Sequence, residues 1–413
     1  MAALALGAIT TQAKDYILTD HGVKNDSTIL QTQAIQNVID SASAHGGGRI
    51  VIPKGTFLSG ALFFKPGTKL VLNEGGTLKG SDDIKDYPLL PSRMEGKNIY
   101  YYAALVNAYY VKGFGIEGPG TVNGNGLKFW KRFWAMYYPA KKAGRKWTNL
   151  EVHRPRLVFV WGCDSVTFKG ARFVNSGYWT THFYQCNDIL IENCEMLAPR
   201  KPVRAPSTDA VDLDVCKRVV IRGCNISTDD DGVCIKGGKG PLAHKGNENG
   251  IVEDVLVENC TFGPSLHGIL TMGSEAIHAK NIVLRNCEVN TTCALLRLKM
   301  RPDTYQTYED ITIENVKGRC GTVIDMKPWT QFYTLEGTGE KPYGTVRNII
   351  IKDVDVDCIN FGRMNGNAND KVSNITLHNI KAKAQKGGFI NMYKEATKLK
   401  DVKINNKKLH YKE

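Results

Sequence analysis

A short pattern of apolar and polar positions recurs along the second half of the chain. Each unit begins with Asp, Asn or Arg, continues as a run of β-branched residues and leucine, and ends in Asn, Gly or Asp before Cys or another apolar residue. Short apolar runs bounded by turn residues are typical of β-strands rather than helices. The units occupy residues 188–194, 218–224, 254–260, 281–287, 310–316, 348–354 and 374–380.

The spacing of these units predicts the architecture. Their starts lie roughly 26 to 38 residues apart, within the periods of solenoid proteins. One such strand cannot bury its apolar face, whereas stacked coils share a core and pair their backbone groups with the coils on either side. We therefore expect an all-β chain folded as a right-handed parallel β-helix. Because a solenoid is one elongated domain however many coils it has, residues 14–413 are expected to form a single domain.

A helix is expected before the first coil, where apolar residues recur at helical spacing. Asp26, Ser27 and Thr28 can cap its start and Gly46 can end it, which gives a helix of about 17 residues. Such a helix would cover the open end of the β-helix. Its apolar face is expected to contain Ile35, Val38, Ile39 and Ala42.

Residues 124–154 interrupt the repeat with an insertion rich in aromatic and basic side chains. A loop of this length in a compact fold is usually functional. It can form a cleft wall that stacks on sugars and meets carboxylates, or an apolar flap that covers the core. The side chains concerned are Phe129, Trp130, Lys131, Arg132, Phe133, Trp134, Tyr137, Tyr138, Lys141, Lys142, Arg145, Lys146 and Trp147.

The net charge of +13 indicates an anionic partner. Nucleic acid is not expected, because the chain has no lysine-rich tail, zinc pattern or known nucleic-acid-binding module. Residues 1–13 are similar to the end of a signal peptide and its cleavage site, which predicts export. No other apolar run has the length that a membrane span needs.

The eleven cysteines do not indicate disulfides, because their number is odd and four of them repeat with the units. Cys194, Cys224, Cys260 and Cys287 occupy the same place in successive units. They are expected to form an interior ladder of small apolar side chains. None has the paired spacing of a zinc site, and neither a metal nor a cofactor is expected.

Acidic residues fall on neighbouring coils of the predicted stack. Asp209 lies about one period before Asp230 and Asp231, and His267 lies on the next coil. Taken alone, a run of aspartates in a turn indicates a solvated loop or a calcium site. Three carboxyls side by side can also supply the acid and the base of a hydrolase, because like charges raise the pKa of at least one of them.

Two cations follow on a later coil. Arg297 and Lys299 are two positions apart on one predicted strand, so their side chains face the same side. Carboxylates beside such cations predict an enzyme that cleaves an anionic substrate.

Four ordered motifs resemble those of the polygalacturonases, glycoside hydrolase family 28, and the resemblance covers nearly the whole chain. The family motifs are Asn-Thr-Asp, Asp-Asp, Gly-His-Gly and Arg-Ile-Lys. Ser stands here for the first Asn, and Leu for the first Gly of the third motif. The matching segments are Ser207-Thr208-Asp209, Asp230-Asp231, His267-Gly268 and Arg297-Leu298-Lys299.

The resemblance implies inverting hydrolysis of α-1,4-galacturonosyl bonds in polygalacturonate or pectin, with no cofactor. Asp230 would be the general acid, while Asp209 and Asp231 would hold and deprotonate the water. His267 would steer the acid or contact the substrate. Asp229 precedes the matching pair and is expected to lie outside the catalytic set.

The resemblance also implies a binding site for the acidic polysaccharide. Arg297 and Lys299 would bind the uronate carboxylate. His182 and Lys236 are further candidates to reach the cleft.

Other functions remain open at this point. They are hydrolysis of the rhamnogalacturonan backbone, a calcium-dependent pectate lyase, and a non-catalytic polysaccharide-binding β-helix. The insertion at residues 124–154 favours exo action, because a β-helix groove is open at both ends unless a segment closes it. A capped solenoid has no need to associate, so a monomer is expected.

Overall fold

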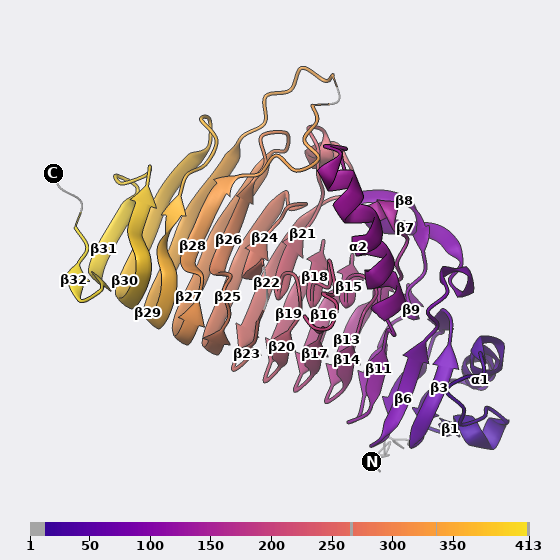
Figure 1. Cartoon of the computed structure of the whole chain (residues 1–413). Coiled ribbons are helices and arrows are strands. Elements are labelled where there is room, and N and C mark those ends of the chain that lie inside the picture. Colours follow the sequence, from indigo (N-terminus) through magenta and orange to yellow (C-terminus); the bar gives the residue numbers. More distant parts are fainter. Residues whose placement is uncertain (1–12, 265–266, 336, 411–413) are drawn as a thin grey trace, which may run out of the picture.

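The computed structural model describes residues 13–264, 267–335 and 337–410. Thirty strands of this part join one sheet system whose coils stack along a single axis (Figure 1). The predicted right-handed parallel β-helix is confirmed. Residues 1–12 of the expected signal peptide lie outside the described residues, so export stays a prediction. No helix among the described residues has the length and apolar character to cross a membrane.

A first column of parallel strands runs the whole length of the molecule. It contains the predicted repeat units, whose apolar residues lie in register: Ile189 pairs with Val219, and Val219 with Val255. Its strands are β1 (Asp15–Ile17), β2 (Gly48–Ile52), β5 (Thr68–Leu72), β10 (Gly115–Glu117), β13 (Asp164–Lys169), β16 (Asn187–Glu192), β19 (Lys217–Arg222), β22 (Ile251–Glu258), β25 (His278–Asn290), β27 (Gln306–Cys320), β29 (Gly344–Met364), β30 (Lys371–Asn391) and β31 (Thr397–Ile404).

A second column follows the first after a sharp turn on each coil. The last strand of this column pairs with β25. Because β25 also pairs with β22 of the first column, single long strands run through both columns from β25 onward. The strands of the second column are β3 (Gly55–Ser59), β6 (Gly76–Gly80), β11 (Thr121–Asn123), β14 (Arg172–Val174), β17 (Glu195–Leu197), β20 (Asn225–Ser227) and β23 (Thr261–Phe262).

A third column closes each coil and carries the site described below. It joins the last part of β29. Its strands are β4 (Leu62–Phe64), β9 (Val106–Tyr109), β12 (Val158–Trp161), β15 (Thr181–Tyr184), β18 (Val211–Asp214), β21 (Val233–Lys236), β24 (Gly268–Met272), β26 (Ala294–Met300) and β28 (Thr322–Pro328). Outside the columns, β7 (Leu89–Met94) and β8 (Lys97–Tyr102) form an antiparallel hairpin, and β32 (Lys407–Lys408) pairs antiparallel with β31.

The polar residues of each unit have a backbone reason. Asp188 and Asn193, which open and close one unit, have positive φ angles of 55° and 53°. Asp254 and Asn259 do the same on a later coil, with 58° and 55°. Asn and Asp tolerate this left-handed conformation better than other residues with a side chain, so the turns select them.

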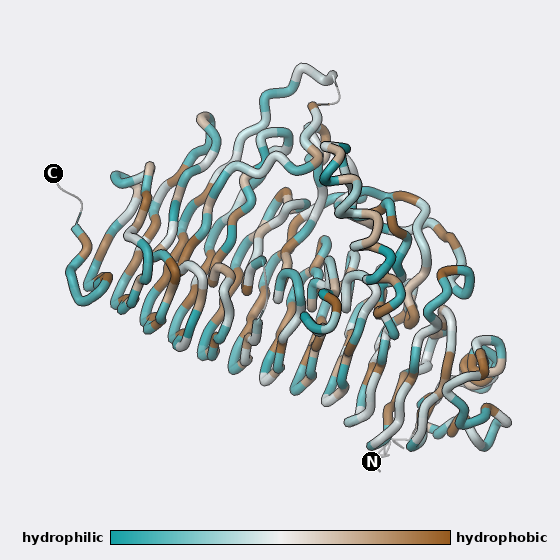
Figure 2. The backbone as a smooth tube through the Cα atoms, in the orientation of Figure 1, coloured by the Kyte–Doolittle hydropathy of each residue, from teal (hydrophilic) through white to brown (hydrophobic). Residues whose placement is uncertain are grey.

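The core is a continuous apolar interior. Along the strands, apolar and polar positions alternate in Figure 2, and the turns are mostly polar. All eleven cysteines are free and buried, which confirms that Cys194, Cys224, Cys260 and Cys287 form part of the interior rather than disulfides.

The amino-terminal helix forms, but its predicted start is wrong. Helix α1 spans Thr32–Ala44, which is 13 residues, and its N-cap Gln31 makes no side-chain cap. Asp26 instead accepts hydrogen bonds from the backbone N and Oγ1 of Thr28, and so stabilises a turn ahead of the helix. The predicted apolar face is buried as expected, with Ile35, Val38, Ile39 and Ala42 inside.

The insertion at residues 124–154 is built around a helix, where the sequence predicted a loop. Helix α2 spans Leu127–Lys142, which is 16 residues. Its Phe129, Trp130 and Phe133 recur at helical spacing and are buried. Figure 1 shows α2 lying beside the third column, next to β15 and β18.

An alternating row of charges runs across the outside of the first column. Residues in register on successive coils are Glu117, Lys169, Glu192, Arg222, Glu258, Arg285, Glu314 and Lys352. Glu192 illustrates the contacts, with Lys169 at 2.9 Å on one side and Arg222 at 2.6 Å on the other. We call this row the charge ladder. Facing opposite charges on neighbouring strands stabilise the observed register, whereas like charges would destabilise it.

Candidate active site

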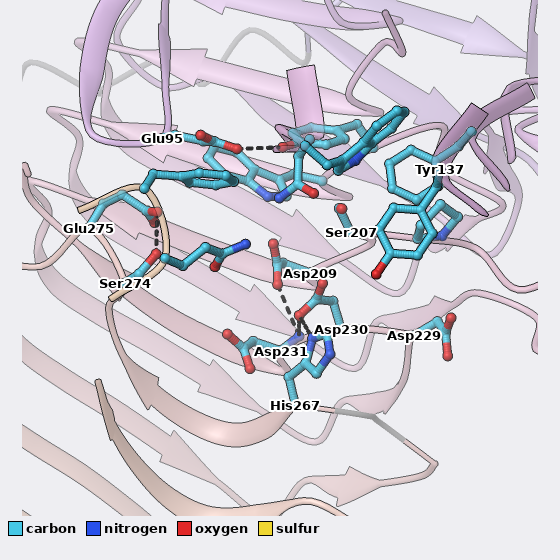
Figure 3. Close-up of a pocket in the computed structure, with 18 of the residues that line it drawn as sticks. Glu95, Tyr137, Ser207, Asp209, Asp229, Asp230, Asp231, His267, Ser274 and Glu275 are labelled. Carbon is cyan, nitrogen blue, oxygen red and sulfur yellow. Dashed lines mark hydrogen bonds and ion pairs between the residues drawn. The ribbon is translucent and has the colours of Figure 1, made fainter. Parts of the chain in front are cut away.

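A cavity of about 850 Å³ opens on the outer face of the third column. Figure 3 shows Asp209, Asp230 and Asp231 in its middle, Glu95 and Glu275 to one side and Tyr137 to the other. Acidic, basic and aromatic side chains all line it. Besides those six residues they include Phe133, Trp134, Tyr138, Lys141, Arg145, Lys146, Trp147, Tyr178, Trp179, Asp229, Lys236, His267, Lys299, Trp329 and Phe332.

Stacking of the coils brings the three predicted aspartates together. Asp209 lies just before β18, and Asp230 and Asp231 lie just before β21, the next strand of the third column. The backbone N of Asp231 donates to Oδ1 of Asp209 and to Oδ1 of Asp230, at 3.0 Å each. The backbone N–H of Asp231 therefore holds the carboxyls of Asp209 and Asp230 close to the side chain of Asp231.

The pKa values of Asp209 and Asp230 are shifted in opposite directions. Burial and then the negative charge of Asp230 raise the pKa of Asp209 well above its usual range. Burial acts in the same direction on Asp230, but the charge and hydrogen bond of His267 outweigh it and lower the pKa of Asp230 to about 2. The crowding argument therefore holds for the cluster, yet the raised pKa lies on Asp209 and not on Asp230, the residue that the resemblance implies as the acid.

His267 is paired directly with Asp230. Its Nδ1 is hydrogen-bonded to Oδ1 of Asp230, and the charge of Asp230 raises the pKa of His267. The backbone oxygen of His267 accepts a hydrogen bond of 2.6 Å from Nη1 of Arg297. The Asp230–His267 pair therefore shares one proton beside the cavity, and Arg297 supports the backbone of the histidine.

Lys299 and Arg297 face the same side of β26, as the sequence predicts, but they do different things. Nζ of Lys299 donates to Oδ2 of Asp231 at 2.9 Å, and Lys299 lines the cavity. Arg297 is not among the lining side chains; its Nε lies 3.5 Å from Asp325. Both cations lie near the ring of Trp329, at 5.0 Å for Lys299 and 5.3 Å for Arg297.

Lys236 is buried against the cavity in a network of charges. Its Nζ lies 3.3 Å from Asp212 and 3.2 Å from Glu275, and it lies 4.2 Å above the ring of Trp179. The predicted position of Lys236 at the cleft therefore holds, with its charge shared between two carboxylates.

The expectation that His182 reaches the cleft is wrong for this structure. His182 is fully buried and does not line the cavity. Its Nδ1 lies 2.7 Å from Nη1 of Arg156, and Nε2 lies 3.6 Å from Asp214. Burial lowers the pKa of His182 to about 3, so the ring is neutral. The side chain supports the strand beneath the site.

Several lining residues were missed from the sequence. Glu95 lies at the turn of the β7–β8 hairpin, Trp329 and Phe332 follow β28, and Glu275 follows β24. Each lies in a segment that leaves the repeat, so its distance from the aspartates along the chain is not a whole number of coils. Interruption of the repeat was the available signal, and it was used for residues 124–154 alone.

The arrangement suits proton transfer better than calcium binding. Ligand atoms of Asp230, Asp231 and His267 lie within 4.8 Å of one another and could in principle hold a metal ion. Calcium, however, takes 6–8 oxygen ligands, and here one of the three donors is a ring nitrogen. Lys299 already binds Asp231 with its own positive charge. The residues present therefore do not fit the calcium ion that the lyase alternative requires.

The chain is similar to known proteins both in sequence and in fold. A probable polygalacturonase from Vitis vinifera is 26% identical over 418 residues, which cover 93% of this chain and 78% of that protein. An endo-polygalacturonase from Pectobacterium parmentieri is 26% identical over 333 residues, 79% of this chain and 77% of that protein. The crystal structure of an exopolygalacturonase from Thermotoga maritima shares the fold, with a TM-score of 0.76 at 22% identity over 96% of this chain and 93% of that one.

The family assignment itself rests on a match across most of the chain. The model described as Glycosyl hydrolases family 28 matches residues 43–407, which include all four motifs and the cavity's carboxyls. The chain therefore belongs to glycosyl hydrolases family 28 and is a glycoside hydrolase.

Proposed function

We propose that this hydrolase cleaves α-1,4-galacturonosyl bonds of polygalacturonate with inversion, and that it releases single galacturonate units from chain ends. The observation that carries the proposal is a cavity in which three aspartates meet Lys299 and the aromatic residues of α2. Family membership removes the lyase and the non-catalytic alternatives. Both endo- and exo-acting enzymes occur among the similar proteins, so the end preference has to be argued from this cavity.

The proton for the leaving oxygen comes from the Asp230–His267 pair. The lowered pKa of Asp230 and the raised pKa of His267 favour the shared proton on His267. Asp230 relays this proton from His267 to the glycosidic oxygen, and the pair takes up a proton from solvent before the next cycle. Inversion needs a second carboxylate to activate water on the opposite face of the sugar, usually about 6.5 to 9.5 Å away. Here the carboxyls are closer, since ligand atoms of Asp230 and Asp231 lie within 4.8 Å of one another. Asp209 and Asp231 take that role.

Cations of the cavity bind the uronate. Lys299 lines the cavity with its Nζ on Asp231, so a substrate carboxylate bound there lies next to the reacting bond. Lys236 contributes positive charge from its buried position in the cavity wall, and Arg297 acts through its hydrogen bond to the backbone of His267. A positive cavity also agrees with the net charge of +13, because it attracts a polyanion.

The position of α2 beside the cavity supports the proposal of exo action. Nε1 of Trp130 donates to the oxygen of Ser176 ahead of β15, and Nε1 of Trp134 donates to the oxygen of Arg204 ahead of β18, each at 2.9 Å. These contacts fix α2 over coils that precede the catalytic strand β21. Tyr137 and Lys141 of α2 line the cavity there and form an end wall.

Product analysis tests this proposal. Early digests of polygalacturonate should contain galacturonate monomer as the main product, while the viscosity of the polymer falls slowly. The reason is the end wall that α2 is proposed to form, which would admit only the terminal sugar. A rapid loss of viscosity with a ladder of oligomers would show an open groove and an endo enzyme. Faster turnover of rhamnogalacturonan than of polygalacturonate would instead favour the rhamnogalacturonan alternative.

The pH dependence of kcat/KM should be bell-shaped. Asp209 must be ionised to activate water, so activity is lost as the pH falls through its raised pKa. The Asp230–His267 pair must hold its proton, so activity is lost again as the pH rises through the raised pKa of His267. In His267→Gln the proton has to reside on Asp230 alone, and the alkaline limb should move to lower pH. An alkaline limb that does not move in this variant would contradict the shared proton.

A further inference from the structure

The tip of the β7–β8 hairpin carries a carboxylate into the substrate cavity. We propose that Glu95 accepts a hydrogen bond from the free 4-hydroxyl of the sugar at the non-reducing end of the chain, and so makes the site specific for chain ends. This inference rests on the proposed function and names the residue that reads the chain end.

The conformation of the turn is unusual for a glutamate. Met94 pairs with Lys97, so Glu95 and Gly96 form a two-residue hairpin loop, with positive φ angles of 46° and 74°. Such loops ordinarily have Asn or Asp in the first position, because a longer side chain is disfavoured in the left-handed region. Strained or unusual turn residues are concentrated at binding sites.

The hairpin is held firmly enough to position one side chain. Arg93 is fully buried, with its Nε 2.9 Å from Asp214 and its Nη2 2.7 Å from Asn249. Arg156 donates to Oγ of Ser92 at 2.6 Å and to the oxygen of Arg93 at 3.0 Å. The residues before the turn are therefore fixed to the core of the third column.

The hairpin tip packs directly on the cavity wall. A Cβ atom added to Gly96 would lie 2.8 Å from Cβ of Glu275, so no larger residue fits there. The Glu95 side chain is only 12% exposed and lines the cavity. Figure 3 shows Glu95 across the cavity from Asp209.

The partners of Glu95 leave room for a ligand. Oε1 accepts a hydrogen bond of 3.3 Å from Oη of Tyr178, and Oε2 lies 3.7 Å from Nζ of Lys239. An ionised carboxylate offers about four acceptor positions, so these two contacts do not exhaust it. Lys239 also offsets the negative charge that would otherwise repel an acidic sugar.

Sugar chemistry then decides what the carboxylate can recognise. In an α-1,4-linked chain the O4 atom of every interior unit belongs to a glycosidic bond and has no proton to donate. The unit at the non-reducing end alone has a free 4-hydroxyl. A buried acceptor in a cavity wall binds a group that can donate a hydrogen bond to it more tightly than an analogue that lacks the donor.

Two trigalacturonates with different non-reducing ends test the inference. One is saturated; the other carries a 4,5-unsaturated terminal sugar, which has no 4-hydroxyl. The wild-type enzyme should cleave the saturated trimer faster. Glu95→Gln, and Glu95→Ala as a second variant, should lower kcat/KM for the saturated trimer by roughly 10- to 100-fold and change the rate for the unsaturated trimer little, because a hydrogen bond to a charged group is lost only with the first.

Matched controls separate this role from a structural one. Glu74→Gln makes the same change at an exposed position of the surface and should leave both rates unchanged. Equal losses on both trimers in the Glu95 variants would assign Glu95 to support of the hairpin and overturn the inference. So would a wild-type enzyme that cleaves the two trimers equally. A ladder of oligomers from polygalacturonate with the wild-type enzyme would instead overturn end attack itself, which is a separate result.

Discussion

Asp230→Asn reduces hydrolysis of polygalacturonate by about 10²- to 10⁴-fold, the usual contribution of a general acid, while the substrate still binds. Asn has nearly the shape of Asp but cannot take the proton that Asp230 shares with His267. Steady-state kinetics measure the loss of kcat, and binding of a galacturonate oligomer to the variant shows that the cavity remains intact. Near-normal turnover would exclude Asp230 as the proton donor.

The same chain offers a close control one position earlier. Asp229 also lines the cavity, but its carboxylate is bound to Nε of Arg204 at 3.0 Å and lies 3.5 Å from Nε of Arg200. Asp229→Asn should therefore cost much less turnover than Asp230→Asn. Equal losses in the two variants would mean that any change of charge in this turn disturbs the site.

Lys299→Met should lower kcat/KM on polygalacturonate by roughly 30-fold or more, because truncation of one partner of a buried charge pair costs about 2 to 5 kcal/mol. Part of this loss comes from Asp231, which loses the Nζ group 2.9 Å away, and part from the uronate carboxylate. A fully methyl-esterified galacturonan separates the two parts, since it has no charge to bind. The loss should be clearly smaller on that neutral polymer.

Lys327 provides the matched control for this second variant. It pairs in register with Lys299 on the following coil but does not line the cavity. Lys327→Met removes the same charge one strand further along. It should lower kcat/KM only slightly, and to the same extent on both polymers. If Lys299→Met lowers kcat/KM equally on both polymers, Lys299 orients Asp231 and does not bind the uronate.

The cluster of aspartates was predictable because residues one period apart in the sequence lie side by side on neighbouring coils. Asp209 and Asp230 are separated by one coil, so a parallel stack must bring them together, and the register of β18 with β21 does so. The same logic placed Arg297 and Lys299 on one face of one strand. The cysteine ladder was predictable for the same reason.

Features that depend on contacts outside the repeat were not predictable. His182 lies on β15 with its side chain pointing outward, but Arg156 and the anchored hairpin cover it. No residue near position 182 in the sequence indicates that the side chain is covered. The segment of helix α2 was interpreted as a loop that forms either a cleft wall or an apolar flap, whereas it is a helix with both kinds of contact: Trp130 is buried beneath it, and Tyr137 lines the cavity. Asp26 was taken for a helix cap, but it accepts hydrogen bonds from Thr28 in a turn ahead of the helix.

The charge ladder limits how a chain of this kind can change its length. Because the sign alternates from coil to coil, loss of the single coil that carries Glu192 would bring Lys169 opposite Arg222. Two like charges would then face each other on adjacent strands, which destabilises the pairing. Loss of two successive coils would instead bring Lys169 opposite Glu258 and restore an attractive pair. Duplication and deletion of coils in this part of the molecule are therefore better tolerated in even numbers.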